Sequence, residues 1–157
     1  TQLDRFGQAN ISALGPDYAR PKTQMLGVRG YPGNSINHAN SFFVPNHSPK
    51  VFVEGEVDMV CSAGYNPGRL ARGWSLDEID IRLVVTQLCV MDFGGPDHQL
   101  RLRSLHPGVG IDQVRQATGF EIHVGDDVGT TPAPTEAQLA LLARLDPHGL
   151  RASALGS

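Results

Sequence analysis

A glycine-rich turn at residues 27–38, with the sequence GVRGYPGNSINH, most constrains what this chain can fold into. Three glycines within seven residues let the backbone approach a ligand closely. A helix that begins near Gly33 would direct its free N–H groups at a negative charge there. The apolar segment at residues 24–28 predicts a short buried strand before the turn. A strand, a glycine turn and a helix in succession indicate an α/β sheet with a ligand at the carboxyl edge of its strands.

Arg29 gives this turn a permanent cation with a fixed fork of donors, which suits a phosphate, a carboxylate or an enolate oxygen. The turn is then a cradle for an anion. The alternative interpretation is a tight surface turn capped by Asn34 or Ser35, because glycine-rich loops are common. His38 follows Asn34 by four residues and would share its helical face. There it either faces the ligand or makes ordinary packing and hydrogen-bond contacts.

Strand and helix patterns alternate along the rest of the chain. Dense aliphatic segments predict strands that are buried on both faces, whereas strict alternation predicts a strand with one exposed face at residues 100–105. The other predicted strands are at residues 10–13, 51–53, 81–85, 87–91 and 120–124. Predicted helices are at residues 34–43 and 112–118, with a last one after the N-cap candidate Thr135 that carries Leu139, Leu142 and Leu145 as an apolar stripe. The pattern favours an α/β fold with a mostly parallel open sheet flanked by helices.

Composition sets the limits on partners and location. A chain of 157 residues with 40% apolar content can bury one core, so we expect residues 1–157 to form a single α/β domain. A net charge of −3 without a lysine-rich run argues against nucleic acid or an anionic membrane as a partner. No apolar run approaches the ~20 residues needed to cross a bilayer. Cys61 and Cys89 lie in apolar surroundings, which predicts buried thiols in a reducing, cytoplasmic compartment.

The sequence offers few side chains for catalysis. It has no Gly-x-Ser-x-Gly nucleophile motif and no His-Glu-x-x-His zinc motif, so we predict no metal and no serine nucleophile. Glu54 and Glu56 follow the predicted strand at residues 51–53, where α/β sheets commonly carry functional groups. We interpret Glu56 as a polar strand end in solvent, and Glu54 remains a candidate for substrate binding.

Five motifs in order resemble the β subunit of the class I CoA-transferase family. They are residues 4–12 (DRFGQANIS), 27–38, 51–54 (VFVE), 90–94 (VMDFG) and 104–109 (SLHPGV). The match runs nearly from end to end and implies the CoA-transferase-like (NagB/RpiA-like) fold. Residues 27–38 and 92–98 (DFGGPDH) are most similar to the branch of actinobacterial cholesterol ring-cleaving hydrolases. Those enzymes act on the last steroid rings as CoA thioesters.

The resemblance implies a site at the glycine turn. Transferases of the family use a Gly-x-Gly-Gly oxyanion turn, and here the segment from Gly30 to Gly33 has Pro32 in place of a glycine, which removes one N–H donor. The family's glutamate nucleophile, in a Ser-Glu-Asn-Gly motif, does not occur in this sequence. In the family that motif lies upstream, and the chain begins at Thr1 rather than Met. We therefore expect it to be the C-terminal part of such a subunit.

In the ring-cleaving branch the resemblance implies that an α subunit supplies the glutamate and β supplies polar groups. Carbon–carbon hydrolysis beside a carbonyl passes through an enolate, for which each fixed donor contributes about 3 kcal/mol by analogy with oxyanion holes. We therefore predict Arg29 as the enolate or carboxylate clamp. Asn34 and Asn37 would orient the substrate, with Gly30 and Gly33 lining the pocket.

The remaining expectations concern partners and alternatives. We expect an α subunit in an α2β2 heterotetramer, an acyl-CoA substrate, and no cofactor other than the coenzyme A of that substrate. The loop at residues 64–74, which carries Tyr65 and Trp74, is the predicted contact surface. Two alternatives stay open. One is a true CoA-transferase for glutaconate or a 3-oxoacid, and the other is a structural subunit without catalytic groups.

Overall fold

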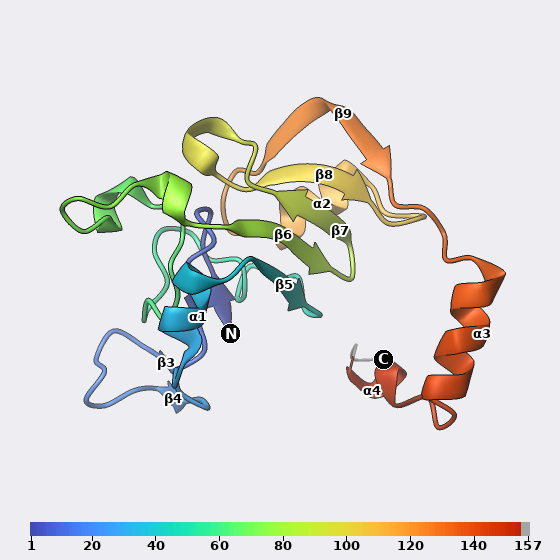
Figure 1. Cartoon of the computed structure of the whole chain (residues 1–157), viewed down its shortest axis with the longest axis horizontal. Helices are drawn as coiled ribbons and strands as arrows, with labels where there is room; N and C mark the ends of the chain where they lie inside the picture. The colour runs from blue at the N-terminus through green and yellow to red at the C-terminus, as the bar shows by residue number, and fades with distance from the viewer. Residues whose placement is uncertain (155–157) are drawn as a thin grey trace.

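The computed structural model describes residues 1–154 and has a five-stranded sheet at its centre (Figure 1). The strands lie in the order β5 (Asn40–Val44), β6 (Ile81–Thr86), β7 (Cys89–Asp92), β8 (Arg101–Leu105) and β9 (His123–Thr130). The β5–β6 and β8–β9 pairings are parallel, and the two inner pairings are antiparallel. Short turns before β7 and β8 permit antiparallel neighbours, whereas parallel pairs need the longer crossovers seen here. The predicted α/β class is confirmed.

Two small antiparallel ribbons from the N-terminus accompany this sheet. The strand β1 (Gln2–Leu3) pairs with β2 (Ala9–Asn10), and β3 (Ala13–Leu14) pairs with β4 (Thr23–Gln24). Leu3 also forms an isolated parallel bridge with Phe52. This bridge takes the place of the strand predicted at residues 51–53.

The core lies between the sheet, the first ribbon and the helix α2 (Ile111–Ala117), which Figure 1 shows behind β8. Phe52, Val84, Met91 and Val114 are fully buried there. Gly119, just after α2, approaches the backbone so closely that a Cβ would lie 2.3 Å from the carbonyl oxygen of Phe52. Its N–H donates to that same oxygen at 2.7 Å, so only glycine fits this position.

Four further predicted elements are wrong in extent or type. The single strand predicted at residues 10–13 is instead the end of β2 and the start of β3, and residues 11 and 12 between them are not in a strand. The helix predicted over residues 34–43 is α1 (Tyr31–Asn37), and residues 40–44 form β5 instead. Phe42, Phe43 and Val44 favour a strand, and pairing with β6 gives their backbone partners that a lone helix end would lack. The buried strand predicted at residues 24–28 is absent, and Leu26 is fully exposed. The strand predicted at residues 120–124 begins only at His123.

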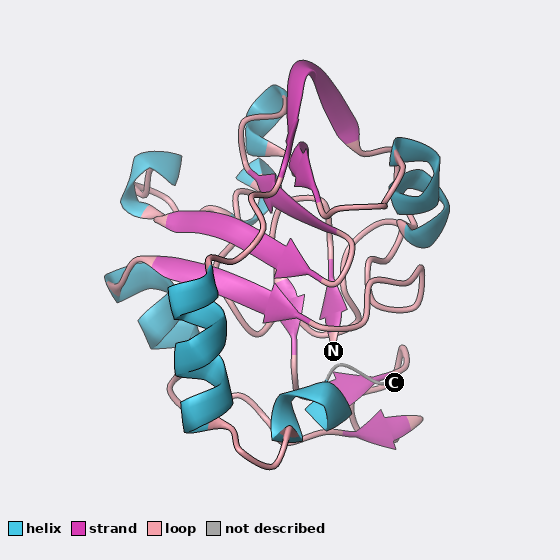
Figure 2. Ribbon diagram, turned by 90° about the vertical axis from the view of Figure 1, so that its right-hand side faces the viewer, coloured by secondary structure: helices cyan, strands magenta, loops and turns pink. Residues whose placement is uncertain are grey.

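The last predicted helix is confirmed as α3 (Glu136–Leu145), with Thr135 in a capping box with Gln138. Figure 1 shows α3 and α4 (Leu150–Ala154) standing away from the sheet, on the side that faces the viewer in Figure 2. The predicted leucine stripe of α3 is exposed. The stripe therefore follows helical periodicity without packing on this chain's own core. Within residues 1–154, no helix is long and apolar enough to cross a membrane.

His47 connects the sheet to the elements around it. Its Nδ1 lies 3.1 Å from the Thr86 hydroxyl and its Nε2 lies 3.0 Å from the Thr118 hydroxyl. The ring stacks on Phe52 with 4.0 Å between ring centroids. Burial lowers the pKa of His47 from 6.5 to about 4, because the charged imidazolium is poorly solvated there. The imidazole therefore stays neutral at physiological pH.

The lowered pKa of His47 predicts acid instability. Between pH 6.5 and 4 the unfolded chain binds more protons at His47 than the folded chain does, so stability falls as pH falls through this window. The glutamine of His47→Gln cannot titrate. We therefore expect its free energy of unfolding to fall by about 2–3 kcal/mol less than that of the wild type between pH 7 and pH 4. Urea unfolding at both pH values measures this difference. The exposed His148→Gln control should show the same pH dependence of unfolding as the wild type. If the free energy of unfolding of His47→Gln changes with pH in parallel with that of the wild type, the lowered pKa of His47 is contradicted.

Candidate functional site

The helix α1 and the turn before it form the candidate site. The helix begins at Tyr31 rather than near Gly33, with Gly30 as its N-cap and Pro32 in its first turn. Proline is favoured at such a position because it has no N–H to leave unpaired and its φ is already helical. Gly27 and Arg29 both have positive φ, at 87° and 41°. For arginine this conformation is strained by about 1–3 kcal/mol, a cost typical of functional turns.

One face of α1 is anchored to the body of the protein. The Ser35 side chain is fully buried, donates to the carbonyl of Pro32 and accepts the backbone N–H of Ala63, both at 2.8 Å. Tyr31 packs edge-on against Phe42 of β5, with 6.4 Å between the ring centroids. The helix therefore has a fixed orientation although it is only two turns long.

The opposite face carries the predicted site residues, and all of them are exposed: Arg29, Gly30, Gly33, Asn34, Asn37 and His38. The structure thus brings the arginine, both asparagines and the histidine onto one exposed segment. His38 is the C-cap of the helix and not part of it. Asn37 Nδ2 donates to the Gly33 carbonyl at 2.9 Å, so its second N–H and its carbonyl oxygen are left for a ligand.

Two backbone donors of the turn are committed or missing. The N–H of Tyr31 donates to the Val28 carbonyl at 2.9 Å, and Pro32 has no N–H. Among the described residues the N–H groups of Arg29, Gly30 and Gly33 have no acceptor, so these donors remain for a ligand. The guanidinium of Arg29 adds a permanent charge to them, which suits an oxyanion.

Glu54 is not brought to this helix. It is exposed in the segment after Phe52, and within residues 1–154 no hydrogen bond or ion pair joins it to α1. Its neighbour Glu56 is exposed, as predicted, and forms a bidentate ion pair with Arg69, whose hydrogen bond lowers the carboxyl pKa. Glu56 therefore holds the loop at residues 64–74 and is not free for chemistry.

A buried polar layer under α1 was not found from the sequence. Asn10 is completely buried, and its amide donates to Gln2 and to the Ala13 carbonyl at 2.7 Å each. Ser62 accepts the N–H of Ala9 at 2.9 Å, one residue before the Ala63 that binds α1. Each buried donor thus has a partner, which fixes the segment that supports the helix. The motif at residues 4–12 was its only sequence signal.

Both cysteines are buried and free, as predicted. Burial raises the pKa of Cys89 to about 11, so its thiol remains protonated and is not a nucleophile. Among the described residues, no three His, Cys, Asp or Glu side chains gather as a metal site.

Asp4 is the second buried group that the sequence did not reveal. Its Oδ1 accepts the N–H groups of Phe6 and Gln8 at 3.0 and 3.1 Å, while its Oδ2 is buried and has no hydrogen-bond partner within residues 1–154. Burial raises the pKa of Asp4 to about 6, and the charge of Glu56 adds to the shift. Protonation of Oδ2 removes the negative charge from this buried, unpaired oxygen and so avoids the free-energy cost of burying it.

The raised pKa of Asp4 makes its effect on stability opposite to that of His47. Between about pH 4 and 6 the folded chain binds more protons at Asp4 than the unfolded chain does, so stability falls as pH rises. We expect the free energy of unfolding of Asp4→Asn to rise by about 2 kcal/mol relative to that of the wild type between pH 4 and pH 7.5. The reason is that an amide keeps the Oδ1 acceptor without a charge. Chemical unfolding at the two pH values tests this. The exposed Asp17→Asn serves as control, and a difference from wild type that stays constant with pH would refute the role of Asp4.

Sequence comparison identifies relatives over nearly the whole chain, although no family model matches it. The chain is 49% identical over 154 residues to the cholesterol ring-cleaving hydrolase IpdB subunit of Mycobacterium tuberculosis, covering 96% of this chain and 59% of the relative. It is 32% identical over 146 residues to a 3-oxoadipate CoA-transferase subunit of Pseudomonas knackmussii, covering 92% of this chain and 55% of the relative. The chain therefore spans less than two thirds of the length of these relatives.

Solved structures agree with this relationship. Rhodococcus jostii RHA1 IpdAB superposes with a TM-score of 0.88 at 43% identity, over 99% of this chain and 62% of the other. Glutaconate coenzyme A-transferase from Acidaminococcus fermentans superposes with a TM-score of 0.80 at 26% identity, over 90% of this chain and 54% of the other. Over nearly its whole length the chain is similar to subunits of CoA-transferases. It is more similar still to the subunits named as cholesterol ring-cleaving hydrolases.

Proposed function

We propose that this chain is part of the β subunit of an enzyme that opens a steroid-derived ring by hydrolysing a carbon–carbon bond of a cyclic diketo acyl-CoA. The observation that carries the proposal is the 49% identity with a cholesterol ring-cleaving hydrolase subunit over 96% of the chain. The exposed turn supports it, because Arg29 lies there beside backbone N–H groups, including those of Gly30 and Gly33, that have no acceptor among the residues that the structure describes.

The proposed reaction fits the charge of this turn. Water adds to a ring carbonyl, the bond from that carbon to its neighbour breaks, and the electron pair of the bond becomes an enolate. The oxygen of water ends in a new carboxylate, and the enolate carbon takes up a proton. Arg29 would stabilise the enolate oxygen as a fixed cation, while Asn34 and Asn37 orient the substrate. An oxyanion hole made of backbone donors is less suited here because Pro32 removes one of them.

We further propose that an α subunit completes the site, in an α2β2 assembly located in the cytoplasm. The site residues on α1 are all exposed, so a second surface is needed to enclose a substrate. The solved structure named IpdAB supports a two-subunit arrangement, and two buried free thiols support a reducing compartment. Coenzyme A would enter only as part of the substrate, without a separate cofactor, and neither nucleic acid nor a membrane is proposed as a partner.

Replacing Arg29 tests its role in the complete assembly. Arg29→Lys keeps the charge but loses the planar fork, so we expect turnover of the acyl-CoA to fall about 100-fold or more, with little change in melting temperature. The exposed Arg20→Lys is the matched control and should retain wild-type turnover. Near-normal turnover in both Arg29→Lys and Arg29→Ala would remove Arg29 from the mechanism and favour a structural subunit.

A true CoA-transferase is the second candidate, because the chain also resembles 3-oxoadipate and glutaconate CoA-transferases. Transfer would proceed through a covalent acyl-enzyme and require an acceptor acid. We expect incubation of the complete enzyme with a cyclic diketo acyl-CoA in 18O-labelled water to place label in a new carboxylate, with CoA retained on the product. Parallel incubations with acetate or succinate should give the same rate. Movement of CoA onto the added acid, without label in a ring-opened product, would favour the transferase.

A further inference from the structure

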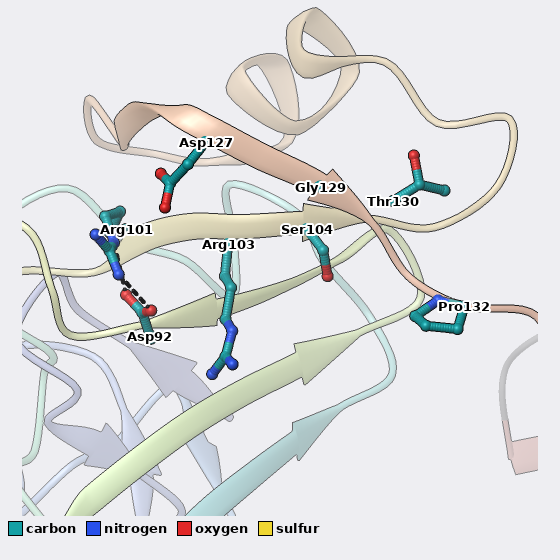
Figure 3. A pocket seen from close by; sticks show the side chains of 8 residues that line it. All are labelled: Asp92, Arg101, Arg103, Ser104, Asp127, Gly129, Thr130 and Pro132. Atoms are coloured by element: carbon teal, nitrogen blue, oxygen red, sulfur yellow. Dashed lines mark hydrogen bonds and ion pairs between the residues drawn. The ribbon is translucent and has the colours of Figure 1, made fainter.

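A polar cavity between β8 and β9 has no part in the site at α1. Its volume is about 590 Å³, within the range of small-molecule sites. Figure 3 shows the side chains that line it: Asp92, Arg101, Arg103, Ser104, Asp127, Gly129, Thr130 and Pro132. Ser104 opens the SLHPGV motif, which the proposed function does not use.

The cavity exists because β9 leaves β8 locally. Leu102 pairs with Val124, but Ser104 pairs with Gly129, so residues 125–128 bow away opposite Arg103. Such an irregularity is a β-bulge, and bulges often open a sheet beside a binding site. The backbone of Arg103 therefore has no partner in β9, and its side chain lines the cavity.

The two arginines of the cavity differ in how they are neutralised. Arg101 forms a bidentate ion pair with Asp92, with N···O distances of 2.9 and 2.7 Å. The negative charge of Asp127 also stabilises the Arg101 cation. Arg103 is exposed, and its guanidinium makes no hydrogen bond or ion pair with the described residues. Figure 3 shows it directed away from Asp127, on the side of the cavity where Asp92 lies, and its charge acts on the Asp92 carboxylate without a hydrogen bond. Arg103 thus offers an uncommitted cation at the cavity.

Ser104 has a defined hydrogen-bond polarity. Nε2 of His106 lies 2.8 Å from the Thr86 carbonyl, which only accepts, so in the neutral form of the ring Nε2 carries the proton. Nδ1 then accepts from the Thr131 hydroxyl at 3.0 Å. Thr131 has no second proton, so Ser104 must donate to it across 2.9 Å. Only lone pairs of the Ser104 oxygen remain for a ligand, and they accept a hydrogen bond.

We propose that this cavity binds a phosphate group, with Arg103 holding a charged oxygen and Ser104 accepting the hydrogen bond of a P–OH group. Hydrogen phosphate and a singly protonated phosphate ester both carry an anionic oxygen and a hydroxyl on one phosphorus. Sulfate carries the same charge without a donor, so this cavity discriminates against it. The phosphate comes either from the free ion or from an ester such as the 3′-phosphate of CoA, and only the latter source rests on the proposed function.

Binding measurements on the full chain in its natural assembly test this at pH 7.5, where an ordinary histidine is mainly neutral, with inorganic phosphate, sulfate, CoA and dephospho-CoA as probes in calorimetric titrations. We expect phosphate to bind several-fold more tightly than sulfate, with this preference lost in Ser104→Ala. Arg103→Gln should weaken phosphate binding at least about tenfold, whereas the exposed strand arginine control Arg82→Gln should not. A phosphate affinity no better than that of sulfate, or unchanged in Arg103→Gln, would overturn the proposal.

The CoA pair separates the two sources of phosphate. Binding of CoA that exceeds that of dephospho-CoA at least tenfold, with the difference lost in Arg103→Gln, identifies the 3′-phosphate ester. Equal binding of the two, alongside Arg103-dependent binding of the free ion, identifies inorganic phosphate. Both outcomes support the cavity as a phosphate site, and both are independent of whether the enzyme hydrolyses or transfers.

Discussion

The neutral imidazole of His47 is the contact on which much of the structure depends. It bonds Thr86 at the end of β6 and Thr118 at the end of α2, and it stacks on Phe52, which is bridged to β1. These segments are far apart in the sequence, so the ring closes several long loops at once. A charged ring would be poorly solvated in this buried position, whereas each nitrogen of the neutral ring pairs with one hydroxyl at no such cost. The packing of α2 on the sheet is therefore coupled to the position of the N-terminal ribbon.

This arrangement gives α1 a rigid base. The N-terminal ribbon carries the buried polar layer around Asn10, and the segment that this layer fixes presents the N–H of Ala63 to Ser35. A short helix has little stability of its own, so its orientation comes from these contacts. The buried side of α1 is ordered by hydrogen bonds, while its exposed side keeps the polar groups that chemistry needs.

The sequence was sufficient where local pattern decides the structure. Continuous aliphatic segments predicted β6 and β7, and apolar periodicity with Thr135 predicted α3. It was insufficient at residues 40–44, because their strand forms only by pairing with β6 forty residues later. The turn at Arg29 could be located from its glycines. Asp4 and His47 could not be recognised, since their shifted pKa values arise from burial that only the tertiary structure creates.

The exposure of Arg29 also limits what this chain can do on its own. Two unit charges at 4 Å interact by about 1 kcal/mol in water but by about 4 kcal/mol at the effective dielectric constant of a partly buried site. An open turn therefore gives an enolate only a small part of the stabilisation that an enclosed oxyanion hole provides. The strain of Arg29 at positive φ is present already without substrate, so the cation needs no reorganisation when charge develops. What the turn lacks is a low-dielectric environment, and a surface that covers α1 and excludes water would supply it.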